Sequence, residues 1–97
     1  MNKREIILES YPDLEIMTAD GFDDAIIGYC ERSDKVIYSI KECINILINQ
    51  DMSEEEAFEY FYYNVEGAYM GDKTPIWCND LVFNQIFSEN SSEAEKY

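Results

Sequence analysis

The sequence predicts a small α+β domain in which an antiparallel hairpin or small sheet packs against a capped pair of antiparallel helices. Two observations lead to this prediction. Short apolar runs at 25–30 and 36–39 flank a polar loop at 31–35, which is typical of a β-hairpin. The segments near 40–49 and 54–68 each begin with a capping pattern and then repeat apolar residues at helical spacing.

Length and composition indicate one folded domain. The chain has 97 residues, of which 46% are hydrophobic and 14% aromatic, so it can bury a core, although a small one. We expect residues 1–88 to form this single domain. Residues 89–97 are polar and predict a C-terminal tail.

The N-terminal part begins with a short predicted helix. Residues 2–10 suit a helix with Ile6 and Ile7 facing inward, and the helix ends before Pro12 because the residue preceding a proline is pushed out of the helical region. Residues 14–18 fit either a strand or an extended connection.

The strands come next. Ala25 to Cys30 predicts a buried strand, because it is short, apolar and followed by a polar turn. Residues 36–39 are predicted to form a second strand that pairs with it. Since a lone two-stranded hairpin is marginal in water, we expect a third strand, from residues 14–18 or from 75–78. Pro75 favours an edge position for the latter.

Two capping boxes predict the helical pair. Ser39 with Glu42 starts the first helix, and Ser53 with Glu56 starts the second, with Met52 placed as a hydrophobic staple. Each helix has one apolar face: Ile40, Cys43, Ile44, Leu47 and Ile48 in the first, and Ala57, Phe58, Phe61, Val65 and Ala68 in the second.

The chain leaves the helical pair through glycine. Gly67 lies inside the second helix or at its end, and Gly71 is the better stop signal, after which the loop leads back to the sheet. Apolar residues within 79–87 suit a terminal helix.

The charge balance is extreme. Twenty-one acidic residues face seven basic ones, giving a net charge of −14. Such a field repels nucleic acid and anionic membranes and attracts basic surfaces. Either the acids only solvate the surface, or they form a face for a basic protein partner. We therefore expect a protein partner with a basic surface, no direct nucleic-acid binding and no membrane association, and a homo-oligomer stays open.

The residue types present argue against catalysis. The chain has no histidine, and its three cysteines are widely spaced with no CxxC pair. These facts disfavour a catalytic triad, a zinc knuckle and a disulfide framework. We expect no enzyme activity, no cofactor and no metal centre, and the absence of a signal peptide or long apolar run favours a cytoplasmic protein.

The aspartates at the start of the first strand are the first candidate site. Counting from Asp20, a calcium loop of the EF-hand type would need an oxygen ligand where Phe22 stands. An Asp-Gly turn with local capping is the favoured interpretation. A magnesium site or an acidic patch for a partner involving Asp23 and Asp24 stays open.

The tyrosines of the second helix are the second candidate site. Tyr60 and Tyr63 point away from its apolar face, on the side of Glu56 and Glu59, as in many protein interfaces. They could equally cover a second core face, and Trp77 is either core or an interface anchor. The full predicted partner-binding set is Asp20, Asp23, Asp24, Glu55, Glu56, Glu59, Tyr60, Tyr63, Glu66, Tyr69 and Trp77.

The segments DGFDDAIIG at 20–28 and EEAFEYFYYNVEGAYMGDKTP at 55–75 form an ordered pattern. The pattern, over about residues 11–77, resembles that of small acidic proteins encoded by tailed phages and prophages. The resemblance implies a phage or mobile-element origin and a bacterial cytoplasm. It implies no catalytic residue.

These observations lead to one main functional hypothesis, a phage accessory protein that acts by binding and inhibits a host or anti-phage defence protein. A narrower alternative is a nucleic-acid mimic that blocks a basic groove. A protein that sequesters a small ligand and a structural or virion component are further alternatives.

Overall fold

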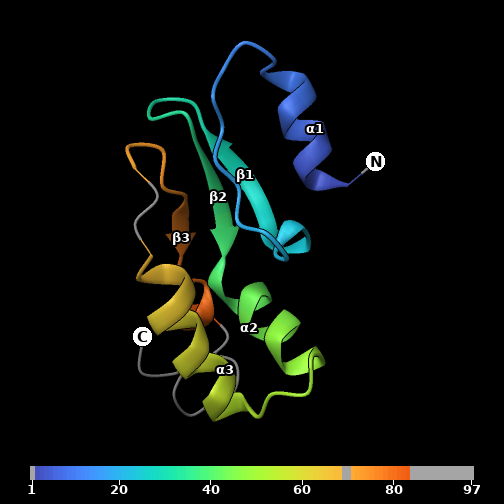
Figure 1. Cartoon of the computed structure of the whole chain (residues 1–97), viewed down its shortest axis with the longest axis vertical. Coiled ribbons are helices and arrows are strands. Elements are labelled where there is room, and N and C mark those ends of the chain that lie inside the picture. Colours follow the sequence, from blue (N-terminus) through green and yellow to red (C-terminus); the bar gives the residue numbers. More distant parts are fainter. Residues whose placement is uncertain (1, 69–70, 84–97) are drawn as a thin grey trace.

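The computed structural model describes residues 2–68 and 71–83 and confirms the α+β fold class. A three-stranded sheet with the order β1-β2-β3 lies in the middle of the molecule. Helix α1 lies beside β1 at one end, and helices α2 and α3 occupy the other end (Figure 1). Residues 14–18 form an extended connection and not a strand.

Helix α1 (Lys3–Ser10) forms as predicted and begins with a capping box. The Asn2 side chain accepts a hydrogen bond from the Glu5 amide (2.9 Å), and the Glu5 carboxylate accepts one from the Asn2 amide (3.0 Å). The prediction that Ile6 faces inward is wrong. Ile7 is buried, whereas Ile6 is 49% exposed, because a helix packed only at the end of the sheet buries one narrow stripe.

Strands β1 (Ile26–Cys30) and β2 (Lys35–Ser39) form the predicted antiparallel hairpin. The prediction of a buried strand at 25–30 is wrong in two respects. Ala25 belongs to the 3₁₀ turn η1 (Asp23–Ala25), and β1 lies at the end of the strand order, so Ile27 is 53% exposed. The central strand is β2.

The third strand, β3 (Ile76–Cys78), pairs with β2 in the parallel sense. Parallel neighbours need a long crossover connection. Here α2, α3 and the segment η2 (Phe61–Glu66) lie between β2 and β3 in the chain and supply this connection. The parallel pairing of β3 therefore requires that these helices fold back along the sheet.

Helix α2 (Ile40–Asn49) is followed by α3 (Glu54–Tyr60), which continues as the π-helical segment η2 (Phe61–Glu66). The predicted apolar face of α2 is confirmed, because all its members are buried except the half-buried Ile48. On the second helix Ala57 and Phe61 are buried, but the prediction for Ala68 is wrong, since it is exposed just beyond the end of η2. The prediction that Gly71 stops this helix is also wrong, because the helix ends at Glu66 and Gly67 is its C-cap.

The two helix starts differ from each other. The capping box of Ser53 and Glu56 is confirmed, with hydrogen bonds of 2.9 and 3.1 Å. Ser39 caps α2 by accepting from the Glu42 amide (3.0 Å), but the described part of the chain shows no return bond from the Glu42 carboxylate. Instead Asp80, just beyond β3, accepts hydrogen bonds from Ser39 Oγ (2.5 Å) and from the Lys41 amide (3.0 Å).

The core centres on Tyr38, which has no exposed surface. Its ring lies 5.0 Å from the ring of Trp77, and Trp77 meets Phe61 edge-on with centroids 5.5 Å apart. The Tyr38 hydroxyl oxygen accepts a hydrogen bond of 2.7 Å from the Ala19 amide. One side chain thus joins β2, β3 and the connection that precedes η1.

The C-terminal part is described only in its beginning. Residues 81–83 are helical, in line with the predicted terminal helix. The remainder of 79–87, the boundary after residue 88 and the tail at 89–97 fall on residues outside those described, so they stay predictions.

The first testable prediction concerns the Asp80 bridge. Partial burial by itself raises the pKa of the Asp80 carboxyl, but the hydrogen bonds from Ser39 and the Lys41 amide outweigh burial and lower it below the ordinary value of 3.8. Replacing Asp80 with alanine should lower the free energy of unfolding at pH 7 by about 1–3 kcal/mol. Urea unfolding measures this, with Asp72→Ala at an exposed position as control.

The lowered pKa of Asp80 also determines how the free energy of unfolding depends on pH. A carboxyl whose pKa is lower in the folded chain stabilises the fold above its unfolded pKa and loses that contribution as the pH falls through the folded value. The difference between the native chain and Asp80→Ala should therefore shrink as the pH falls below 3.8. A difference that stays constant in acid would contradict the proposed role of the ionised carboxylate.

Candidate functional site

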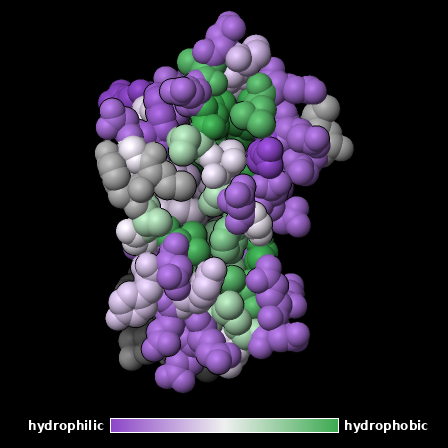
Figure 2. All heavy atoms as spheres, viewed as in Figure 1, coloured by the Kyte–Doolittle hydropathy of each residue, from purple (hydrophilic) through white to green (hydrophobic). Residues whose placement is uncertain are grey.

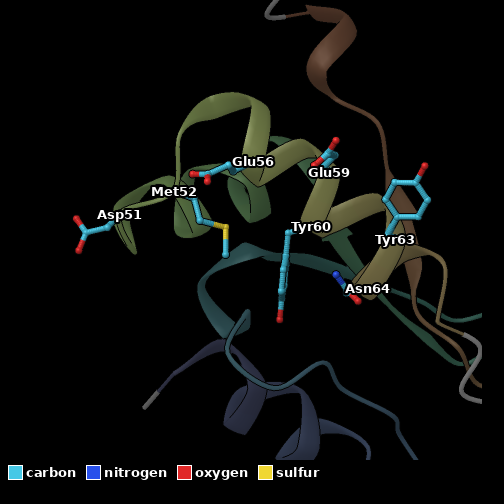
Figure 3. Close-up of a pocket in the computed structure, with 7 residues that line it drawn as sticks. All are labelled: Asp51, Met52, Glu56, Glu59, Tyr60, Tyr63 and Asn64. Atoms are coloured by element: carbon cyan, nitrogen blue, oxygen red, sulfur yellow. The ribbon is translucent and has the colours of Figure 1, made fainter.

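Four of the predicted site residues meet on one face of the second helix. Glu56, Glu59, Tyr60 and Tyr63 line an open hollow of about 480 Å³, together with Asp51, Met52 and Asn64. We call these seven residues the α3 face (Figure 3). The Tyr60 ring extends away from the helix beside Met52, whereas the hydroxyl of Tyr63 points away from Tyr60.

Helical spacing explains this grouping. Glu56, Tyr60 and Tyr63 follow one another at intervals of four and three residues, which places them along one side of the helix. Phe61 is buried on the other side, and this leaves Tyr60 43% exposed and Tyr63 80% exposed. The prediction that these two tyrosines point away from the core is confirmed.

The turn between α2 and α3 forms the part of the hollow that the second helix does not. Asp51 adopts a left-handed backbone conformation with a φ of 73°. The Asp51 amide bonds to the Ile48 carbonyl oxygen (3.0 Å) and the Met52 amide to the Leu47 carbonyl oxygen (3.4 Å). This is the Schellman arrangement, which ends α2 and places Asp51 and Met52 at the hollow.

The α3 face is acidic. Three carboxylates line the hollow, from Asp51, Glu56 and Glu59, and no lysine or arginine is among its described lining residues. In the described part of the chain, no group of three potential ligands is arranged to hold a metal ion. The combination suits a positively charged group that also has apolar surface, because carboxylates and exposed tyrosine rings lie together.

Asp20 and Trp77 join a second, smaller hollow. It has a volume of about 270 Å³ and shares Tyr60 and Asn64 with the α3 face. We call it the Trp77 hollow. Its lining residues are Thr18, Ala19, Asp20, Phe22, Tyr60, Asn64, Val65, Ala68 and Trp77.

The remaining predicted site residues do not join either hollow. Asp23 accepts a hydrogen bond from the Asn2 side chain (3.2 Å), and the Asp24 carbonyl oxygen accepts one from Lys3 Nζ (3.2 Å). Both residues therefore contact the start of α1, Asp23 through its side chain and Asp24 through its backbone. The predicted Asp-Gly turn is confirmed, because Gly21 has a φ of 89°, but the predicted local capping is wrong, since no side chain caps η1. Glu55 and Glu66 are exposed on the helix without lining either hollow.

Tyr69 lies outside the described residues. Three residues of the α3 face were absent from the predicted set: Asp51, Met52 and Asn64. Asn64 could have been found, because it lies four residues after Tyr60 and hence on the same side of the helix. Asp51 could not, since its position depends on how α2 ends.

Comparisons with protein-family models, curated proteins and solved structures found no match to this chain. The resemblance to small phage proteins therefore stays a prediction. No helix within residues 2–68 and 71–83 has both the length and the apolar character needed to cross a bilayer.

A second testable prediction concerns the turn that forms the α3 face. Glycine has no Cβ and adopts a left-handed backbone at little cost, whereas aspartate does so less readily. Asp51→Gly should therefore raise the free energy of unfolding, by up to about 1 kcal/mol. The control is Asn49→Gly, which places glycine in the last turn of α2 and should lower it by a similar amount. If Asp51→Gly is as destabilising as Asn49→Gly, the side chain of Asp51 stabilises the turn and the prediction is wrong.

Proposed function

We propose that this chain is a small acidic accessory protein of phage origin that binds and inhibits a host or anti-phage defence protein with a basic surface. One observation carries the proposal: the α3 face combines the exposed rings of Tyr60 and Tyr63 with three carboxylates around one hollow. The phage origin and the bacterial cytoplasm rest on the sequence pattern at 20–28 and 55–75.

Tyrosine and carboxylate contribute differently to such an interface. A tyrosine ring buries a large area and loses little side-chain entropy, so exposed tyrosines are frequent anchors of protein interfaces. Carboxylates steer a basic partner towards the face and fix its orientation. The net charge of −14 extends this attraction beyond the contact itself.

The same charge argues against a nucleic-acid ligand and leaves nucleic-acid mimicry as a narrower form of the proposal. Glu55 and Glu56 are exposed in the first turn of α3, and Glu59 is exposed one turn later. A partner that normally holds DNA or RNA could accept this row of acids. Competition between the chain and a DNA or RNA duplex for the captured partner distinguishes mimicry from binding elsewhere on the partner.

A third testable prediction uses matched charge reversals. Tagged protein is used to capture partners from a bacterial lysate at low salt, and affinity is then measured with the purified partner. Glu59→Lys, on the α3 face, should weaken binding by about tenfold or more. Glu9→Lys makes the same charge change at an exposed position of α1 and should weaken binding by much less.

The tyrosine contribution is measured separately. Tyr63→Ala removes a ring that is 80% exposed, so it should leave the free energy of unfolding nearly unchanged while weakening binding by about tenfold. Binding should also weaken as salt is raised. Equal effects of Glu59→Lys and Glu9→Lys, together with no effect of Tyr63→Ala, would rule out the α3 face as the binding surface.

A further inference from the structure

The Trp77 hollow is formed by three segments that are distant in the sequence. Residues 18–22 form one wall, the second helix forms another through Tyr60 and Asn64, and Trp77 of β3 completes it. On the face shown in Figure 2, a discontinuous strip of hydrophobic residues runs down the middle between hydrophilic margins.

The walls of this hollow are held in place by the core. The Ala19 amide donates a hydrogen bond of 2.7 Å to the buried hydroxyl of Tyr38, and the Phe22 side chain is only 7% exposed. Trp77 packs against both Tyr38 and Phe61. A site whose walls are fixed before binding loses less entropy when a ligand enters.

The charged groups of the lining favour a cationic ligand over an anionic one. Asp20 is exposed and contributes a carboxylate, and no lysine or arginine is among the described residues of the lining. An anionic ligand such as a phosphate would find no counter-charge there, whereas a cation would find one. Asn64 adds an amide that can accept or donate hydrogen bonds.

The aromatic residues favour a cation that is flat and weakly hydrated. The indole Nε1 of Trp77 is buried and has no hydrogen-bond partner within the described residues. Trp77, Tyr60 and Phe22 are the aromatic residues of the lining, and the ring of Tyr60, which is 43% exposed, is the most accessible of the three. Aromatic rings attract cations, and the guanidinium group is the biological cation that combines stacking on a ring with paired hydrogen bonds to a carboxylate.

We propose that the Trp77 hollow binds a guanidinium group, which stacks against the aromatic wall and donates hydrogen bonds to the Asp20 carboxylate. Two sources present this chemistry, a free guanidinium compound and an arginine side chain of a protein. Because Tyr60 and Asn64 line both hollows, a basic partner on the α3 face could place an arginine here. Only this second source rests on the proposed function.

Trp77 is the only tryptophan of the chain, so its fluorescence reports on this hollow directly. The probe is Nα-acetyl-arginine amide, titrated into the native protein at low salt. Its matched control is Nα-acetyl-citrulline amide, which has nearly the same shape but a neutral urea group. We expect a saturable change in fluorescence with the arginine compound and none with the citrulline compound over the same concentrations.

Two variants test the role of the carboxylate. Asp20→Asn should weaken binding of the arginine compound by about fivefold or more, because it removes the charge from the hydrogen-bonding partner. Asp13→Asn makes the same change of net charge at an exposed position outside the lining and should have little effect. Circular dichroism verifies that both variants are folded.

Three results would overturn the site: no saturable change with the arginine compound, an equal response to the citrulline compound, or equal effects of the two variants. A competition experiment with the captured partner then identifies the source of the guanidinium group. Displacement of the partner by the arginine compound assigns the site to a partner arginine, and binding without displacement assigns it to a free guanidinium compound. The titration uses no partner protein. A negative result in the partner-binding experiments would therefore not affect the test of guanidinium binding.

Discussion

Most of the structure depends on the interactions of one buried side chain, that of Tyr38. It lies on the central strand, packs its ring against Trp77 of the parallel strand and accepts a hydrogen bond from the Ala19 amide. Burial raises the pKa of its phenol above the ordinary value of 10.0, so ionising this hydroxyl would cost more than in an exposed tyrosine. Because the wall at residues 18–22 and the indole of Trp77 are both held by this side chain, the Trp77 hollow follows from the packing of the core.

The acidic residues of the chain serve two different purposes. Glu5, Glu56 and Asp80 bind free amides at the starts of helices, where a carboxylate also complements the helix dipole. Asp20 and Glu59 line the hollows, and the described part of the chain shows no hydrogen bond to either side chain. A net charge of −14 destabilises a small domain through self-repulsion, and the acids that cap helices partly offset this cost.

Local sequence patterns predicted much of the fold, and long-range contacts explain what they could not predict. The Ser53 capping box, the hairpin and the apolar face of α2 are encoded within a few residues, and all are confirmed. The parallel pairing of β3 and the Asp80 bridge depend on residues about 40 positions apart. The exposure of Ile27 depends on which strand lies at the edge of the sheet. For the site, helical spacing grouped Tyr60 and Tyr63 with Glu56 and Glu59, whereas the meeting of Asp20 with Trp77 required the tertiary structure.

The most direct test of the central claim, that the α3 face contacts a basic partner, is site-specific photo-crosslinking. A photoreactive phenylalanine analogue replaces Tyr63 in one version of the protein and Glu9 in the other, since both side chains are exposed and lie on different helices. We expect a crosslink from position 63 to a lysine- or arginine-rich segment of the partner and none from position 9. A crosslink from position 9 alone, or one from position 63 to an acidic segment, would contradict the claim.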